Sequence, residues 1–312
     1  MISALFSIFI FPGFLFLFIL ALAAEYMDRK LYARMQNRVG PPWFQPFADL
    51  VKLLAKELII PENADRVIFK LLPLVACSAV VTAFLYMPIW EPFSLFNFKG
   101  NIVAVIYIMT LPTLTYFLGG WYSRSLYSLI GSMRVLTQLF SYEVPLLMAV
   151  LAPGILASSW TFSTVINFYS AQGFLFLVNI IGFIVALIAV QGKLEKVPFD
   201  IPEAETEIVA GTFTEYTGPL YAYFKLAMNM QAIAAATLLA AVFMPFGYNC
   251  GFILGILIYL LKIAFIIALL AVIRTIFARI RMDQMVNFCW KYLAPMALLQ
   301  ITINIFIKAF IQ

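Results

Sequence analysis

The stretch CGFILGILIYLLKIAFIIALLAVI, residues 250–273, decides the fold class of this chain. Lys262 is its only charged residue, and a helical run of about 20 apolar residues matches the hydrocarbon core of a bilayer. The whole chain is similar in character, because 64% of its 312 residues are hydrophobic, 11% are charged and the mean hydropathy is +0.99. A soluble domain needs a more highly charged surface. The sequence therefore predicts an all-α polytopic membrane protein with a single integral membrane domain over residues 1–312.

Hydropathy predicts about eight transmembrane helices. Their expected ranges are 3–24, 67–89, 101–121, 135–157, 172–191, 220–245, 250–273 and 287–310. The loops that follow the first, third, fifth and seventh of these helices hold nearly all of the lysines and arginines. By the positive-inside rule these loops are cytoplasmic. Both termini are therefore expected on the outer face.

Absent residue types exclude several kinds of cofactor site. The chain has no histidine, so it supplies no imidazole ligand to haem, copper or zinc. Cys77, Cys250 and Cys289 lie far apart and form no CxxC pair, which argues against an iron–sulfur cluster or a zinc site. We expect no catalytic residue, no metal and no cofactor in this chain. An electron carrier would belong to another subunit.

The first cytoplasmic loop, predicted at 25–66, contains the amphipathic segment WFQPFADLVKLLAKEL at 43–58. Its apolar residues recur at helical spacing and form one face. They are Phe47, Leu50, Val51, Leu54 and Leu58. This pattern predicts a helix that lies at the membrane interface or docks a partner.

A second cytoplasmic loop, predicted at 192–219, is acidic and has no lysine or arginine between 197 and 219. Its carboxylates are Asp200, Glu203, Glu205, Glu207 and Glu215. One interpretation is an acidic first turn that stabilises a short helix beginning near Pro202. The other is a site that handles protons. If the helix continued through Gly211, Glu203, Glu207 and Glu215 would share a face, and repulsion would raise the pKa of at least one carboxyl.

Two further charged residues lie deep inside predicted transmembrane helices, well away from their ends. Glu143 lies in the motif SYEVP, and Lys262 lies near the middle of the seventh helix. Ionisable side chains at membrane depth are costly and are usually functional. Pro145 disrupts the helix beside Glu143 and can admit water. We therefore place Glu143 and Lys262 with the carboxylates of the acidic loop in a predicted proton relay.

Five ordered motifs together resemble the membrane subunit that joins the hydrophilic redox arm of respiratory complex I to its ion-pumping membrane arm. They are EYMDRKLYARMQNRVGP (25–41), QPFADLVKLLAKE (45–57), GSMRVLTQLFSYEVPL (131–146), KVPFDIPEAETEIVAGTFTEYTGP (196–219) and RIRMDQMVNFCWKYLAPMAL (279–298). The turn RVGPPWFQP is shorter than in the quinone-reducing members of this superfamily. This compact form is most similar to energy-converting membrane-bound nickel–iron hydrogenases and to their ferredoxin-dependent sulfur-reducing relatives.

The resemblance implies roles for named residues. The acidic loop and Glu143 would form the glutamate chain that leads protons from the redox arm into the membrane, whereas Lys262 matches no family role. The positions expected to face the peripheral arm are Arg34, Arg38, Arg274, Arg279, Arg281 and Asp283. Implied partners are hydrogenase-like large and small subunits carrying nickel–iron and iron–sulfur centres, antiporter-like membrane subunits and the lipid bilayer, but no nucleic acid.

The implied function is an anchor that couples the redox module to proton or sodium translocation in the plasma membrane of a bacterium or archaeon. No activity is expected of the chain alone. Two alternatives stay open. One is the quinone-site subunit of complex I proper. The other is a free-standing secondary transporter, which would be expected to show internal repeats.

Overall fold

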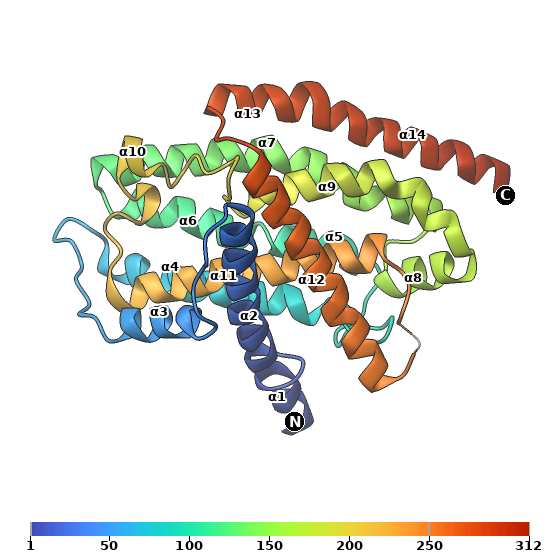
Figure 1. The fold of residues 1–312 in the computed structure, drawn as a ribbon, viewed down its shortest axis with the longest axis horizontal. Coiled ribbons are helices and arrows are strands. Elements are labelled where there is room, and N and C mark those ends of the chain that lie inside the picture. The colour runs from blue at the N-terminus through green and yellow to red at the C-terminus, as the bar shows by residue number, and fades with distance from the viewer. Residues whose placement is uncertain (1, 249, 312) are drawn as a thin grey trace.

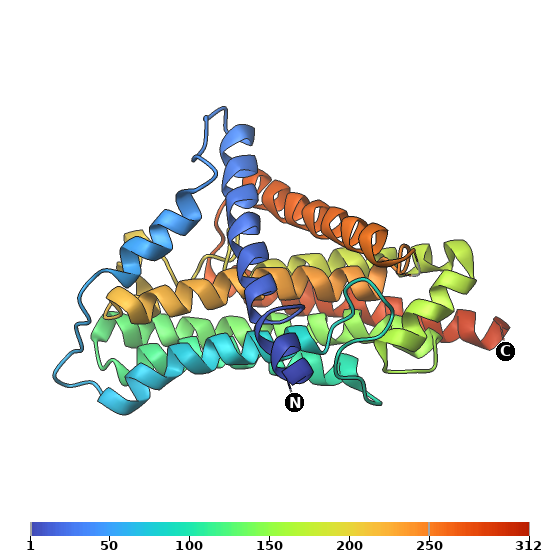
Figure 2. The same cartoon turned by 90° about the horizontal axis from the view of Figure 1, so that it is seen from below.

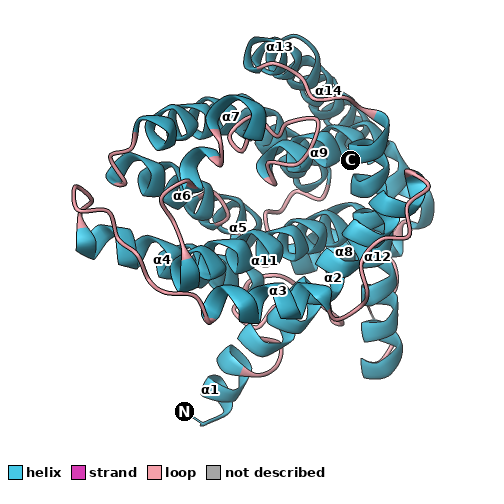
Figure 3. Ribbon diagram, turned by 60° about the vertical axis from the view of Figure 1, so that its left-hand side comes forward, coloured by secondary structure: helices cyan, strands magenta, loops and turns pink. Residues whose placement is uncertain are grey.

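The computed structural model describes residues 2–248 and 250–311, without the side chains of residues 2–4, 205, 206 and 311. Over the described residues the chain is helical and contains no strand (Figure 3). Within the described part of the chain, eight helical segments are long and apolar enough to cross a membrane. The predicted all-α fold with eight transmembrane helices is therefore confirmed.

Some of the eight spans are single helices, and others consist of two or three consecutive helical segments. In chain order, the spans are α1 (Ile2–Phe9) with α2 (Phe14–Met35), α4 (Arg66–Leu85), α5 (Asn101–Ile108) with α6 (Leu111–Tyr122), α7 (Leu126–Leu156), η1 (Gly173–Asn179) with α9 (Ile180–Lys193), α11 (Gly218–Phe243), α12 (Phe252–Ile276), and α13 (Met282–Phe288) with η3 (Cys289–Leu293) and α14 (Ala294–Ile311). The connections hold α3 (Gln45–Leu54), α8 (Phe162–Ala171), α10 (Glu205–Ile208) and η2 (Gly211–Phe213).

Two helices extend well beyond their predicted ranges. Helix α2 continues to Met35 instead of ending near residue 24, and α7 begins at Leu126 instead of near residue 135. The hydropathy of a sequence marks only the hydrocarbon core, whereas a helix can continue into the headgroup region with charged side chains. The first charged loop is therefore shorter than the predicted 25–66.

Helix α11 runs through the middle of the bundle, with α4 on one side and α9 on the other (Figure 1). Its second half, from Ile233 to Val242, is rich in alanine and buried among neighbouring helices. Small side chains let helix backbones approach closely within a membrane. Helices α2 and α12 cross the bundle along one side and converge at their carboxyl ends (Figure 2).

Most charged connections meet at one end of the bundle. The segments 36–44, 55–65, 194–217 and 277–281 follow spans 1, 5 and 7. Segments 194–217 and 277–281 are joined by the pair of Glu207 with Arg279, and Gly218, at the start of α11, packs against the carbonyl of Glu57. We call this end the charged-loop face.

Helix α3 has the predicted amphipathic character. Phe47, Val51 and Leu54 are exposed, whereas Pro46 is buried and faces the protein. An exposed apolar row beside the bundle is suited to lipid or to a partner subunit. The helix lies against α2 and α11.

The acidic loop, 194–217, does not form one long helix. Helix α10 spans four residues, and the chain then turns at Val209 (φ 60°) and Gly211 (φ +57°). Gly211 also lies so close to the carbonyl of Pro202 that a Cβ would meet it at 1.7 Å. The condition under which Glu203, Glu207 and Glu215 would share a helical face, a helix continuing through Gly211, is therefore not met.

A cluster of carboxamides fixes α14 to the rest of the bundle. Asn304 Nδ2 donates to the carbonyl of Ala152 on α7 at 2.7 Å and to Asn179 Oδ1 at 2.8 Å. Gln300 Nε2 donates to Asn304 Oδ1 at 2.9 Å, and its oxygen accepts from the Gly182 amide at 3.1 Å. Polar groups in a membrane must find partners within the protein. These contacts therefore fix the position of α14.

Candidate functional site

A polar cavity of about 270 Å³ opens at the charged-loop face, between α2, α11, α12 and the start of the acidic loop. Its charged lining residues are Glu25, Asp28, Arg29, Glu195, Lys196, Asp200, Glu203, Lys225 and Arg274. So many ionisable groups around one cavity can hold water and exchange protons. We call it the polar cavity.

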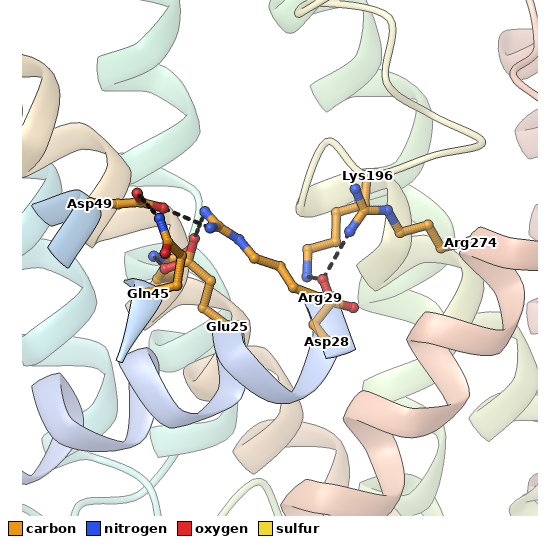
Figure 4. Close-up of polar contacts among 8 residues, drawn as sticks. Glu25, Asp28, Arg29, Gln45, Asp49, Lys196 and Arg274 are labelled. Atoms are coloured by element: carbon orange, nitrogen blue, oxygen red, sulfur yellow. Dashed lines mark hydrogen bonds and ion pairs between the residues drawn. The ribbon is translucent and has the colours of Figure 1, made fainter. Parts of the chain in front are cut away.

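Asp28 holds one side of the polar cavity together. Its Oδ2 accepts from Lys196 Nζ at 2.9 Å and from Arg274 Nη1 at 3.0 Å (Figure 4). The Asp28 side chain is only 6% exposed. Arg274 also lies over the ring of Tyr32, 4.3 Å from its centre. The predicted peripheral-arm residue Arg274 thus points inward, toward Asp28.

A second chain of polar contacts joins α2 to α3. Arg29 pairs with Glu25 one turn earlier and with Asp49 Oδ2 at 2.8 Å (Figure 4). Partial burial opposes ionisation of Asp49, but the hydrogen bonds from Arg29 and Gln45 outweigh it and lower the pKa of that carboxyl. Asn229 of α11 donates to Glu25. Glu25, Arg29 and Asn229 also border a second cavity.

The second cavity, of about 220 Å³, lies between α2, α3 and α11. Glu25, Arg29, Lys225 and Asn229 line both cavities, and Leu22, Leu50 and Leu53 add apolar surface to the second. Asp49, Lys52 and Lys56 add further charge, and a cavity with both apolar and charged lining is able to bind an amphipathic molecule.

The acidic loop distributes its carboxylates over different surroundings. Asp200 and Glu203 line the polar cavity. Glu207 lies outside it and is 51% exposed, where it pairs with Arg134 and with Arg279 at 3.5 Å. The hydrogen bond from Arg134, aided by the charges of Arg279 and Arg281, lowers the pKa of Glu207. Glu215 is half-buried and lines neither cavity, and the Glu205 side chain lies outside the described residues.

The remaining predicted surface residues stay near the charged-loop face. Arg34, Arg38, Arg281 and Asp283 are exposed, and Arg279 is half-buried. Arg279 and Arg281 line a shallow cavity of about 390 Å³ with Arg134 and Glu207. A charged, open surface of this kind is typical of a site for a polar partner.

Glu143 is paired within the membrane. Lys193 Nζ lies 3.3 Å from Glu143 Oε2, and the Lys193 side chain is 1% exposed. The other oxygen of Glu143 is buried and has no hydrogen-bond partner among the described residues. A buried ion pair in which one acceptor is left unsatisfied is a site where a proton or a water molecule can enter.

Lys262 is not close to these carboxylates. Its Nζ donates to the carbonyl of Met244 at 2.7 Å and lies over the rings of Tyr248 and Phe246. Met244 follows the last residue of α11, so this ammonium group satisfies a carbonyl at the negative end of a helix. The structure does not bring Lys262 together with the other predicted relay residues.

Sequence reasoning missed several residues of the site. Glu25, Asp28, Lys193, Glu195 and Lys225 were not among the predicted relay residues, yet they line the polar cavity or pair with Glu143. Glu25 and Asp28 do lie in one of the five motifs, and Lys193 ends an apolar run. Among the described residues, no group of three or more Cys, Asp or Glu side chains is placed to hold a metal ion.

Comparison with known proteins relates this arrangement to a family. The model of a family described as NADH dehydrogenase matches residues 8–305. The chain belongs to the NADH dehydrogenase family. It is 37% identical to the H subunit of the NADH-quinone oxidoreductase from Carboxydothermus hydrogenoformans, over 95% of this chain and 85% of the relative. The H subunit of the same enzyme from Bacillus cereus strain B4264 is 36% identical over 91% of this chain and 87% of that relative.

A solved structure shares the fold of this NADH dehydrogenase family member. A chain of the membrane-bound sulfane sulfur reductase, an archaeal respiratory membrane complex, superposes with a TM-score of 0.83 over 93% of this chain and 96% of that chain, at 22% identity. Together, the family match and the relatives of 36–37% identity confirm the predicted relationship to the complex I superfamily, and this structure confirms the fold. The chain is a complex I-like membrane subunit.

Proposed function

We propose that this chain anchors and couples a complex I-like membrane-bound complex of the hydrogen-evolving or sulfur-reducing kind, with ferredoxin as electron donor. It links a peripheral redox module to translocation of protons or sodium ions. The observation that carries this proposal is the polar cavity at the charged-loop face, with the buried Glu143–Lys193 pair in the adjoining membrane region. Electrostatic coupling between a redox centre and such groups changes their affinity for protons.

Within the proposed relay, Asp200 and Glu203 take up protons in the polar cavity, and Glu143 receives them inside the membrane. Glu205, Glu207 and Glu215 belong to its outer part, at the acidic loop. Lys262 is kept as a proposed member, although its contact with Met244 favours a structural role.

The proposed partners follow from surface chemistry and from the compact turn. The exposed Arg34, Arg38, Arg281 and Asp283 would contact hydrogenase-like large and small subunits, which would carry the nickel–iron and iron–sulfur centres. Antiporter-like membrane subunits would cover part of the lipid-exposed bundle. The charged-loop face would be cytoplasmic and the termini outside, in a bacterial or archaeal plasma membrane.

The test is translocation by the whole complex in sealed vesicles. Glu143→Gln is expected to stop ion translocation while electron transfer from reduced ferredoxin continues, because the amide cannot carry a proton. Unchanged translocation per electron in Glu143→Gln would refute the relay.

A second candidate function is the quinone-site subunit of complex I proper. The cavity between α2, α3 and α11 favours it, because its lining combines the apolar Leu22, Leu50 and Leu53 with charged residues. The relatives from C. hydrogenoformans and B. cereus carry the word quinone in their names. Reduction of a soluble quinone analogue by the intact complex, blocked by Leu50→Trp, would favour this candidate over the first.

A further inference from the structure

Glu195 is a buried carboxyl group to which neither sequence reasoning nor the relay above gives a role. It follows the end of α9 by two residues, with a left-handed backbone of φ 52°, and it is 5% exposed. Neither of its carboxylate oxygens has a hydrogen-bond partner among the described residues. An ionised carboxylate left in this state would cost several kcal/mol or more, so the group requires either a proton or water.

Glu195 lies between two spaces. On one side it lines the polar cavity. On the other it lines a void of about 10 Å³ together with Lys193, Gln231 and Tyr116. That volume holds about one water molecule. Gln231 uses its oxygen to accept from Tyr116 at 3.1 Å, whereas its Nε2 has no acceptor among the described residues.

We propose that Glu195 carries protons from the polar cavity to the Glu143–Lys193 pair through one water molecule held in this void. The inference rests on the proposed function and adds a residue and a water site to it. Gln231 Nε2 and Glu195 would supply partners for the water. Lys193 borders the void and lies 3.3 Å from Glu143, so it connects the two carboxyl groups.

The transfer conserves atoms and charge. A neutral Glu195 gives its O–H proton to the water, Lys193 gives one of its ammonium protons to the carboxylate of Glu143, and the water returns a proton to the Lys193 amine. Glu195 is then the carboxylate and Glu143 the acid, and no electrons move. Lys193 keeps one anionic neighbour before and after the transfer, so the membrane interior never holds two unbalanced carboxylates. Asp200 and Glu203 then return a proton to Glu195 from the cavity.

The charges around Glu195 are consistent with this direction. Burial raises the pKa of Glu195 well above its usual range, and the nearby carboxyl groups of Glu203 and Asp200 raise it further. The groups that face it from other elements are Lys193 of α9, Lys225 of α11, Tyr116 of α6 and Tyr142 of α7. The raised pKa and the lack of a hydrogen-bond partner for either oxygen both favour the protonated form of Glu195.

The test compares Glu195→Gln with the exposed control Glu62→Gln in the intact complex. We expect Glu195→Gln to slow ion translocation by about 100-fold and to remove the infrared band of a protonated carboxyl that wild type and Glu62→Gln both show at neutral pH. Wild-type translocation, or an unchanged band, would overturn the inference. If Glu143→Gln blocks translocation while Glu195→Gln does not, only the role of Glu195 fails. If neither blocks it, the proposed relay itself fails.

Gln231→Leu provides an independent measurement if Glu195→Gln does not assemble. The leucine removes the amide that would hold the water but leaves Glu195 in place. Translocation should slow while the infrared band of the protonated carboxyl persists. Translocation at the wild-type rate in Gln231→Leu would overturn the water site.

Discussion

Asp28 and Arg274 are joined at 3.0 Å, although 246 positions separate them in the chain. The contact holds the carboxyl end of α2 against that of α12, and Lys196 adds the acidic loop to the same carboxylate at 2.9 Å. One buried side chain thus ties together three segments that border the polar cavity. Removal of the Asp28 side chain should therefore destabilise the whole charged-loop face.

Asp28→Ala should lower the free energy of unfolding by about 3 kcal/mol, because two cations lose a shared, desolvated partner. The melting temperature of the purified complex would measure this loss. Glu62→Ala, which removes an exposed carboxylate from the same face, should leave the melting temperature unchanged. Equal melting temperatures for the two variants would show that Asp28 is not a structural hub.

The Glu143–Lys193 pair should behave as a coupled unit. Lys193→Met leaves a buried carboxylate without a counter-charge and should cost about 3 kcal/mol of stability. The double variant Lys193→Met with Glu143→Leu should be less damaged than the sum of the single variants, by about 0.5 to 3 kcal/mol. Thermal unfolding of all four proteins would complete the cycle. Strict additivity would mean that the pair contributes no interaction.

The contact between Glu207 and Arg134 should depend on pH. The pKa of Glu207 is lowered in the folded protein, so its stabilisation is complete above the ordinary glutamate pKa of about 4.3 and is lost as the pH falls through the lower folded pKa. Because Glu207 is half-exposed, we expect less than about 1 kcal/mol. Hydrogen exchange of the α10 amides should accelerate in acid, after correction for the intrinsic rate. Glu207→Gln should remove that dependence.

Gly211 and Gly100 form a matched pair for testing the turn of the acidic loop. Both have a positive φ, of +57° and +96°, so alanine costs about 1 to 2 kcal/mol at each. Only at Gly211 would the new Cβ meet a neighbouring carbonyl, whereas Gly100 has open space. Gly211→Ala should therefore lower the melting temperature more than Gly100→Ala, and should reduce the binding of peripheral subunits.

Lys262 allows a structural role to be separated from a relay role. Lys262→Met loses a charged hydrogen bond to the end of α11 and should cost about 1.5 to 3 kcal/mol. Faster hydrogen exchange of the backbone amides near Met244 would show that this hydrogen bond is lost. If translocation per electron stays normal in the surviving complex, the ammonium only holds the helix end. Lost translocation with unchanged exchange would instead support the relay role.

Much of the fold was predictable because membrane spans are long apolar runs, as 250–273 shows. The ends of α2 and α7 were not, since charged residues continue both helices outside the hydrocarbon core. The shape of the acidic loop was missed for another reason. Gly211 was the one signal of a break, and the left-handed backbone of Val209 has no sequence signature.

The site was predictable only in part. Asp200 and Glu203 do line a common cavity, and Glu143 is buried with a partner. The contributions of Asp28, Lys193 and Glu195 depend on how α2, α7, α9 and α12 cross. A linear pattern presents these residues as ordinary charges at helix ends. The way in which two helices cross depends on the packing of their side chains against each other, and the spacing of residues along one helix does not encode it.

The carboxamides of α14 bear on the order in which the chain is built into the membrane. Gln300 and Asn304 have to leave the translocation machinery before their partners on α7 and α9 can receive them. Two amides facing hydrocarbon are unfavourable, so α14 gains most of its affinity for the bundle only after Asn179 and the Ala152 carbonyl are in position. We therefore expect α14 to dock stably only when α7 and α9 are already correctly placed.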